Sequence, residues 1–285
     1  MLFAMLRLTL IVLATASALV AQARNYDTPF PAHKVIGNVY FVGNEALGTY
    51  LITTPEGHIL INSDFEKTVP QIRVGVAKMG FQFTDIKILL GSHAHGDHQE
   101  ADALVKEFSG ARVMAMEQDV PALRKMMPGG KPHPIDRILK DGEQVTLGGT
   151  TLTAHLTPGH TKGCTTWTWK TQEAGQTYDV VLVCSVGVNP NYILVNNKDY
   201  PEIAEDYPKS FKILRSLPCD VFIAAHGNFY DLEKKYALLG KPETKTNPFI
   251  DPAGYRAYID EKERDFNARL AQQKKAAGSL ASPQR

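Results

Sequence analysis

The stretch from Ile86 to Glu100, IKILLGSHAHGDHQE, restricts what this 285-residue chain can fold into more than any other segment. It begins with a short, nearly continuous apolar run, which is typical of a strand buried on both faces of a sheet. The loop directly after that run holds His93, His95, Asp97 and His98 within six positions. A packed sheet can hold such a loop still, so the pattern predicts a functional site at the end of this strand.

The first 23 residues are typical of a secretory signal peptide. Arg7 is followed by an apolar run from Leu8 to Val20 and then by small residues up to Ala23. The run is short for a membrane-spanning helix, and an uncleaved anchor is the alternative. We expect cleavage after Ala23, a single domain over residues 24–285, and a periplasmic or secreted location.

The charge balance excludes several classes of partner. The chain has 31 Lys and Arg against 30 Asp and Glu, a formal net charge of +1, and loss of Arg7, the only charge in the first 23 residues, leaves zero. Such a balance gives no electrostatic basis for binding nucleic acid or an anionic membrane. We expect a monomer that acts on a small-molecule substrate and does not associate with a membrane after cleavage.

The order of the expected elements indicates two sheets. Runs of β-branched and aromatic residues predict strands, and helical periodicity predicts helices. Strands are expected within 35–62 and at 86–90, 111–115, 144–157, 164–170, 180–184 and 219–225, and helices at about 68–78, 99–108, 118–125, 201–217 and 252–276. Strands followed by helices, twice, predict an α/β fold in which two sheets pack face to face with helices outside, a four-layer αββα sandwich. A disordered tail is expected after the last helix, from Gly278 onward.

The histidine-rich loop has the composition of a zinc site. His93 and His95 are two residues apart and can converge on one ion, whereas Asp97 and His98 are turned away from them and can reach a second ion. Neutral imidazole and carboxylate groups suit zinc, and a catalytic zinc keeps one position open for water. A polar surface loop without metal is the alternative.

Further ligands are available at two other predicted strand ends. His160 lies in LTPGHTKG directly after one strand, and His226 lies in IAAHGN directly after another. The other histidines lack such a setting, and we expect them to be solvated or bonded locally. These are His33, His58, His133 and His155.

HAHGDH, followed by PGH and by a histidine at a strand end, resembles the metallo-β-lactamase superfamily over roughly residues 35–239. The resemblance implies the αββα fold inferred above and two Zn²⁺ ions bridged by a hydroxide. The implied ligands are His93, His95 and His160 for one ion, and Asp97, His98 and His226 for the other.

The end of the strand at 180–184 distinguishes branches of this superfamily. Hydroxyacylglutathione hydrolases and lactonases carry a metal-bridging aspartate there, two β-lactamase subclasses carry a cysteine ligand, and the third subclass carries a serine. Here Cys184 and Ser185 are neighbours, which point to opposite faces of a strand. The spacing of 25 residues from His160 to Ser185, and the presence of His98, favour Ser185 facing the site. The chain is therefore most similar to class B β-lactamases of the third subclass.

Three positions depart from that resemblance. Gly187 stands where members often carry a second hydroxyl that helps hold the substrate carboxylate. Gly227 follows His226 where proline is common, and Asn62 replaces an aspartate that supports the metal ligands. None of the three removes a predicted metal ligand.

The resemblance implies a zinc-dependent hydrolase in which a metal-bound hydroxide opens the β-lactam ring. Asp97 would hold the second ion and orient the nucleophile, and Ser185 would contact the substrate carboxylate. Asn191 and Tyr192 either hydrogen bond the substrate carbonyl or are ordinary loop surface. A di-zinc lactone or thioester hydrolase, and a non-catalytic periplasmic zinc-binding protein, are the alternatives. No serine lies in a GxSxG setting, which disfavours a serine hydrolase.

Export would let two of the three cysteines pair. Cys164 and Cys184 lie at the start and the end of two predicted strands joined by a short turn, QEAGQ, so these ends can meet. Some members of the third subclass have cysteines at both matching places. We expect this disulfide, with Cys219 unpaired and buried, and three free thiols are the alternative.

Overall fold

The computed structural model describes residues 26–281, so the predicted signal peptide lies outside the described residues. The strands are β1 (His33–Ile36), β2 (Val39–Phe41), β3 (Tyr50–Thr54), β4 (Gly57–Ile61), β5 (Ile86–Leu90), β6 (Arg112–Met116), β7 (Arg137–Leu139), β8 (Gln144–Leu147), β9 (Thr150–Leu156), β10 (Thr165–Glu173), β11 (Gln176–Val183) and β12 (Val221–Ala224). The α-helices are α1 (Val69–Lys78), α2 (Gly96–Gln99), α3 (Asp102–Ser109), α4 (Val120–Leu123), α5 (Ile203–Ser216), α6 (Leu232–Leu238) and α7 (Pro252–Ala281).

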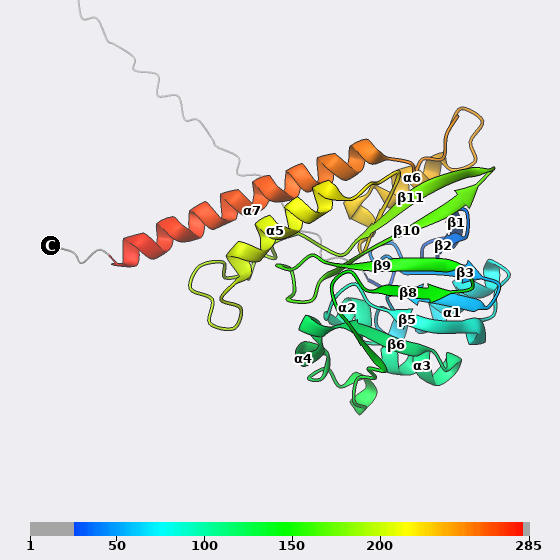
Figure 1. Ribbon diagram of the computed structural model, residues 1–285, viewed down its shortest axis with the longest axis horizontal. Coiled ribbons are helices and arrows are strands. Elements are labelled where there is room, and N and C mark those ends of the chain that lie inside the picture. Colours follow the sequence, from blue (N-terminus) through cyan, green and yellow to red (C-terminus); the bar gives the residue numbers. More distant parts are fainter. Residues whose placement is uncertain (1–25, 282–285) are drawn as a thin grey trace, which may run out of the picture.

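Two sheets face each other between layers of helices (Figure 1). The first has seven strands in the order β1 to β7, and the second has five in the order β12-β11-β10-β9-β8. Strands β1 to β4 are antiparallel neighbours, joined by two-residue turns except for the loop 42–49 between β2 and β3. Strands β4 to β7 run parallel because helices connect them. The predicted four-layer αββα sandwich is confirmed.

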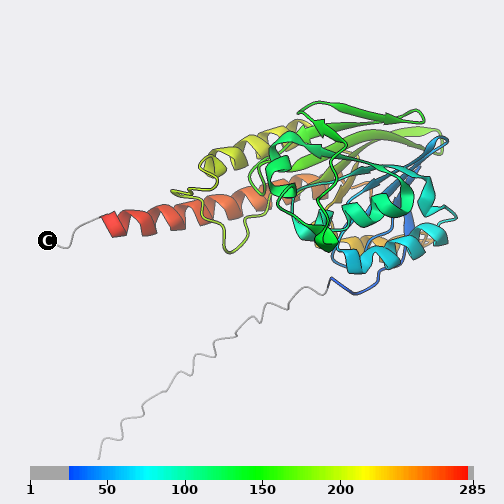
Figure 2. The same ribbon diagram turned by 90° about the horizontal axis from the view of Figure 1, so that it is seen from below.

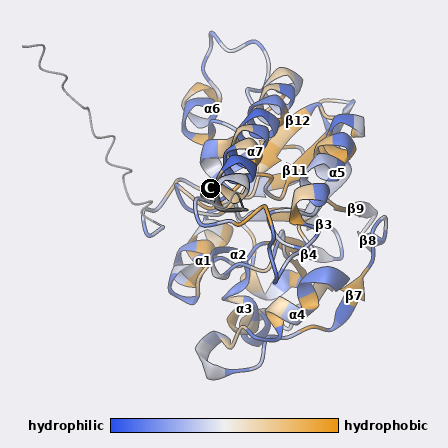
Figure 3. Cartoon of the chain, turned by 90° about the vertical axis from the view of Figure 1, so that its left-hand side faces the viewer, coloured by the Kyte–Doolittle hydropathy of each residue, from blue (hydrophilic) through white to orange (hydrophobic). Residues whose placement is uncertain are grey.

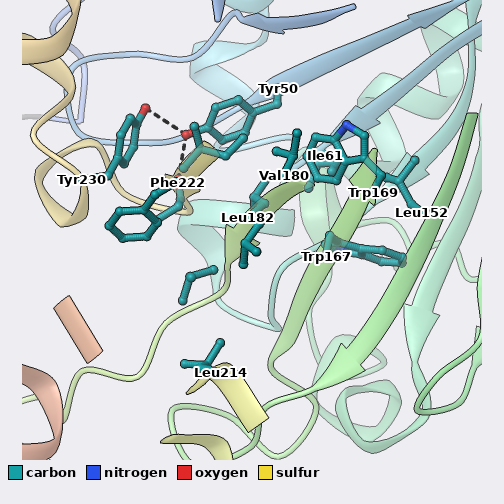
Figure 4. Packing of buried hydrophobic residues seen from close by; sticks show 14 of the residues in the cluster. Tyr50, Ile61, Leu152, Trp167, Trp169, Val180, Leu182, Leu214, Phe222 and Tyr230 are labelled. Atoms are coloured by element: carbon teal, nitrogen blue, oxygen red, sulfur yellow. Dashed lines mark hydrogen bonds between the residues drawn. The ribbon is translucent and has the colours of Figure 1, made fainter. Parts of the chain in front are cut away.

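Alternating side chains build the core of the first sheet. In β4, Ile59 and Ile61 belong to the core cluster between the sheets, which includes Trp167 of β10, and Leu60 belongs to a second cluster formed with α1 and α3. Figure 4 shows Ile61, Trp167 and Trp169 among the side chains of this cluster. Successive residues of a strand point to opposite faces, so one run of apolar residues fills both layers.

Helices α5 and α7 cover the outer face of the second sheet and lie side by side in two views (Figures 1 and 2). Their buried aromatic residues hold them together, because Tyr207 of α5 stacks on Phe266 of α7 with ring centroids 4.9 Å apart. The outward surface of α7 is largely hydrophilic, while β11 and β12 are hydrophobic (Figure 3).

The C-terminal helix is longer than predicted. Residues from Gly278 were expected to form a disordered tail, but α7 continues to Ala281. A single glycine lowers helix stability by only about 1 kcal/mol relative to alanine, and Gly278 is preceded by two alanines. Two other predicted helices also differ from the structure. The helix predicted at 99–108 is divided into α2 and α3, and the helix predicted at 118–125 is shorter and covers only α4.

None of the helices within residues 26–281 is both long and apolar enough to span a membrane.

Candidate metal centre

The six predicted ligands converge where several strands end. His93 and His95 lie on the loop after β5, and Asp97 and His98 lie in the first turns of α2. His160 follows β9, and His226 follows β12. The strands belong to both sheets, so the site forms only when the sheets pack together.

The first triad consists of His93, His95 and His160. The Nε2 atom of His93 is 3.1 Å from Nδ1 of His95. The ring of His160 has its centroid 4.7 Å from that of His93 and 4.8 Å from that of His95. One ligand atom from each residue lies within 4.8 Å of the others, which suits a single ion.

The second triad consists of Asp97, His98 and His226. The Nε2 atoms of the two histidines are 3.2 Å apart. The Oδ2 atom of Asp97 is 3.5 Å from Nε2 of His98 and 3.8 Å from Nε2 of His226. The rings of His93 and His98 have centroids 4.2 Å apart, so the two triads are adjacent.

Hydrogen bonds behind the site orient these imidazoles. Nδ1 of His160 donates to the carbonyl oxygen of Gly187 at 2.8 Å, and Nδ1 of His226 donates to that of Ala46 at 3.2 Å. A carbonyl can only accept, so both rings carry a proton on Nδ1, and in the neutral ring Nε2 is then the atom that can bind a metal. Burial lowers the pKa of His93 and His98 well below the usual value, which keeps both rings neutral. The donor set therefore fits zinc.

Asp119 joins the two ligand-bearing loops, and sequence analysis missed it. Its buried carboxylate accepts hydrogen bonds from the Ala94 amide at 2.8 Å, the Gly163 amide at 2.7 Å and the Thr161 hydroxyl at 2.9 Å. Burial raises its pKa, and these hydrogen bonds act in the opposite direction. Asp119 thus couples the position of the loop that carries His93 and His95 to the position of the loop that carries His160.

Two of the three departures from the superfamily pattern have a structural reason. Asn62 has a φ of 66°, a left-handed conformation that asparagine tolerates well. Its side chain accepts from the Ser92 amide at 2.9 Å and donates to the Gly48 carbonyl at 2.9 Å, which holds the start of the ligand loop. At Gly227 a Cβ atom would lie 2.7 Å from the carbonyl oxygen of Glu45, so only glycine fits this close approach.

A cavity of about 270 Å³ opens beside the triads. It is lined by Tyr26, His95, Asp97, His160, Ser185, Gly187, Val188, Asn189, Pro190, His226, Phe229, Lys262 and Asp265. The predicted substrate residue Ser185 is among them. At Gly187 a Cβ would meet nothing nearer than the Ser185 hydroxyl, 3.9 Å away, so the missing side chain leaves open space.

The other two predicted substrate contacts are placed differently. Asn191 is exposed and does not line the cavity, whereas Asn189, two residues earlier, does. Tyr192 lies against the first triad: its hydroxyl donates to the His160 carbonyl at 2.7 Å and is 3.4 Å from Nε2 of His95. Sequence analysis also missed Lys262, which lies on α7 beyond every recognisable motif.

The remaining four histidines lie outside the two triads. His33 is bonded locally, as expected, because its Nδ1 donates to the Pro31 carbonyl at 2.8 Å. His58 and His133 are buried rather than solvated. Nε2 of His133 is 3.2 Å from Oδ2 of Asp102, and the same carboxyl accepts a hydrogen bond from Ser63 at 2.6 Å. His155 is half-buried and bonds locally to Thr168 at 2.8 Å.

The predicted disulfide is confirmed. Cys164 and Cys184 are joined with Cα atoms 5.9 Å apart, and Cys219 is unpaired. Cys219 is partly buried, and this burial, together with the nearby Asp220 carboxylate, raises the pKa of its thiol to about 12. The Sγ atom of Cys184 lies 3.5 Å from Nδ1 of His93, so the disulfide packs directly behind the first triad.

Solved structures of similar proteins cover almost the whole described chain. The FEZ-1 metallo-beta-lactamase from Legionella gormanii is 47% identical, with a TM-score of 0.82 over 87% of this chain and 98% of that one. BJP-1, a subclass B3 metallo-beta-lactamase of Bradyrhizobium japonicum, is 34% identical, with a TM-score of 0.81 over 88% of this chain and 98% of that one.

Curated sequence relatives are more distant and carry a different name. The hydroxyacylglutathione hydrolase of Hyphomonas neptunium is 26% identical over 196 residues, which is 69% of this chain and 68% of that protein. The hydroxyacylglutathione hydrolase of Cereibacter sphaeroides is 24% identical over 183 residues, or 63% of this chain and 60% of that protein. The family model described as the metallo-beta-lactamase superfamily matches residues 49–226, more than half of the chain. The chain therefore belongs to the metallo-beta-lactamase superfamily of hydrolases.

Proposed function

We propose that this protein is an exported, monomeric di-zinc β-lactamase. The observation that carries the proposal is Ser185, which lines the cavity at the place where hydroxyacylglutathione hydrolases and lactonases would have a bridging aspartate. The similarity to FEZ-1 and BJP-1, at 47% and 34% identity, supports the same substrate class. The signal-like first 23 residues support export to the periplasm or beyond.

The chain offers a complete ligand set for two ions. His93, His95 and His160 would hold one ion, and Asp97, His98 and His226 would hold the other. Zinc bound there would act as a Lewis acid and would bring the pKa of a coordinated water to about 7. Asp97 belongs to the second triad and also lines the cavity, with 19% of its side chain exposed, and would orient the attacking water.

The cavity also offers groups for an anionic substrate. Lys262 is the only lysine or arginine among the described lining residues, and 20% of its side chain is exposed. Its ammonium is held 2.6 Å from Glu261 and 3.9 Å from Asp265. Ser185 and Lys262 would together bind the carboxylate beside the ring nitrogen of a β-lactam, and Lys262 would compensate for the hydroxyl that Gly187 lacks.

A thioester hydrolase is the second candidate, because curated relatives at 24–26% identity are named hydroxyacylglutathione hydrolase. The same two triads could activate water against a thioester or a lactone. The serine in place of the bridging aspartate is the feature that disfavours this activity. A non-catalytic zinc-binding protein is disfavoured because the triads border an open cavity, whereas structural zinc sites are usually closed and rich in cysteine.

Purified, zinc-loaded protein should bind two zinc ions per chain and hydrolyse β-lactams. We expect turnover of a penicillin, a cephalosporin or a carbapenem in the presence of clavulanate, because the proposed mechanism uses no acyl-enzyme serine. A homoserine lactone and a hydroxyacylglutathione thioester should be hydrolysed much more slowly. Elemental analysis that finds less than one zinc per chain would contradict the dinuclear site, and preference for the thioester would favour the second candidate.

Lys262→Ala should raise the Michaelis constant for a penicillin about five- to tenfold with little change in kcat. A hydrogen bond to a charged group contributes about 1.5–3 kcal/mol, and partial exposure reduces that figure. Lys274→Ala, which removes an exposed lysine from the same helix, is the matched control. A penicillin methyl ester, which has no carboxylate, should be hydrolysed equally by Lys262→Ala and wild type. An unchanged Michaelis constant for the free acid would show that Lys262 does not bind the substrate carboxylate.

A further inference from the structure

A loop formed by residues 187–194, between β11 and α5, is bonded to the first triad from one side. The carbonyl of Gly187 accepts hydrogen bonds from His160 at 2.8 Å and from the Tyr207 hydroxyl at 2.9 Å. The Tyr192 hydroxyl donates a hydrogen bond to the His160 carbonyl at 2.7 Å, and Asn189 lines the cavity. The 187–194 loop therefore sets the position of side chains at the candidate site.

Helix α7 holds the same loop from the opposite side. The Gln273 amide makes two hydrogen bonds to loop backbone: Oε1 accepts from the Leu194 amide at 2.7 Å, and Nε2 donates to the Tyr192 carbonyl at 2.7 Å. Arg269, one turn earlier on α7, donates to the Pro190 carbonyl. In Figures 1 and 2 the yellow-green segment before α5 runs beside α7.

The middle of the loop has little apolar burial to hold it, although Val188 and Tyr192 pack partly against the main core. Pro190 and Asn191 are exposed, and the side chain of Ile193 is 56% exposed. Leu194, at the end of the loop, is buried in the main core. Segments with few buried apolar contacts open readily, so the bonds from α7 are a large part of what keeps this loop in one conformation.

We propose that Gln273 and Arg269 are positioning residues for the hydrolytic site. Neither lines the cavity. Both bind backbone atoms of the 187–194 loop, and through it they keep Tyr192 against His160 and Asn189 at the cavity wall. Small displacements of such groups reduce turnover, because reactions need aligned partners. The kinetic consequence rests on the hydrolase activity proposed above, whereas the effect on the loop does not.

The loop itself is tested by hydrogen exchange on the full protein as isolated, without substrate. Gln273→Leu removes both hydrogen bonds while keeping a good helix former of similar size. We expect the Leu194 amide, and the rest of the loop, to exchange roughly ten- to a hundredfold faster than in wild type. Lys274→Leu changes the adjacent, exposed lysine and serves as the matched control. Equal exchange in the two variants would overturn the proposal, whatever substrate the protein hydrolyses.

The consequence for turnover is tested by a double-mutant cycle. On the substrate that the wild type hydrolyses fastest, Gln273→Leu should lower kcat about tenfold, with zinc content and KM close to those of Lys274→Leu. In a Tyr192→Phe background the same substitution should have a much smaller effect, because its action passes through the tyrosine. Arg269→Ala should lower kcat by less than Gln273→Leu does, and this loss should also be smaller in the Tyr192→Phe background. An unchanged kcat, or a full tenfold loss in the Tyr192→Phe background, would contradict positioning of Tyr192.

Discussion

Asp97→Ala is expected to lower kcat/KM by roughly three orders of magnitude or more, because it removes a proposed metal ligand that also faces the attacking water. The Asp97 carboxylate lies 3.5 Å from Nε2 of His98 and 3.8 Å from Nε2 of His226. Without it, two neutral imidazoles remain in the second triad. The loss should therefore appear both in zinc content and in the rate of hydrolysis.

Elemental analysis of zinc-saturated protein and steady-state kinetics measure both effects on the same sample. Asp199→Ala, at an exposed aspartate, is the matched control and should behave as wild type. His93→Ala should reproduce the loss of rate through the first triad. Treatment with a chelator should abolish activity in the wild type, and added zinc should restore it. Full activity in Asp97→Ala would refute the assigned role.

Removal of the disulfide is expected to lower the free energy of unfolding by about 3 kcal/mol, the chain-entropy value for a loop of this size. Cys164 and Cys184 are 20 residues apart and join the start of β10 to the end of β11. For a protein of this length the loss corresponds to a decrease in melting temperature of roughly 6–12 °C. Because Cys184 packs behind His93, activity should also become less resistant to heat.

Thermal unfolding of a Cys164→Ser/Cys184→Ser double variant under non-reducing conditions measures this effect. Cys219→Ser is the matched control, because it removes the unpaired cysteine. Reductant should lower the melting temperature of the wild type and leave that of the double variant unchanged. Equal melting temperatures of the wild type and the double variant would show that the disulfide does not contribute to stability.

The sequence by itself was sufficient to predict the layers and the gathering of the candidate ligands. Strand periodicity and the order of the elements predicted two sheets with helices outside. His93, His160 and His226 each follow a predicted strand, and strand ends of packed sheets meet at one edge. The pairing of Cys164 with Cys184 was also predictable, since a short turn joins their strands. In each case the sequence signal is local to a strand and its adjoining loop, although the ligands meet only when the two sheets pack.

Only the tertiary structure decided how that site is supported. Asp119 bonds two loops that are separated by more than sixty residues from Ala94 to Gly163, and no local pattern marks it. Asn189 rather than Asn191 lines the cavity because the loop turns between them. Lys262 reaches the cavity, and Gln273 reaches the 187–194 loop, only because α7 packs along α5, through contacts such as Tyr207 with Phe266. Periodicity reports which face of an element is buried, but the partner of a polar side chain depends on which distant segment packs beside it.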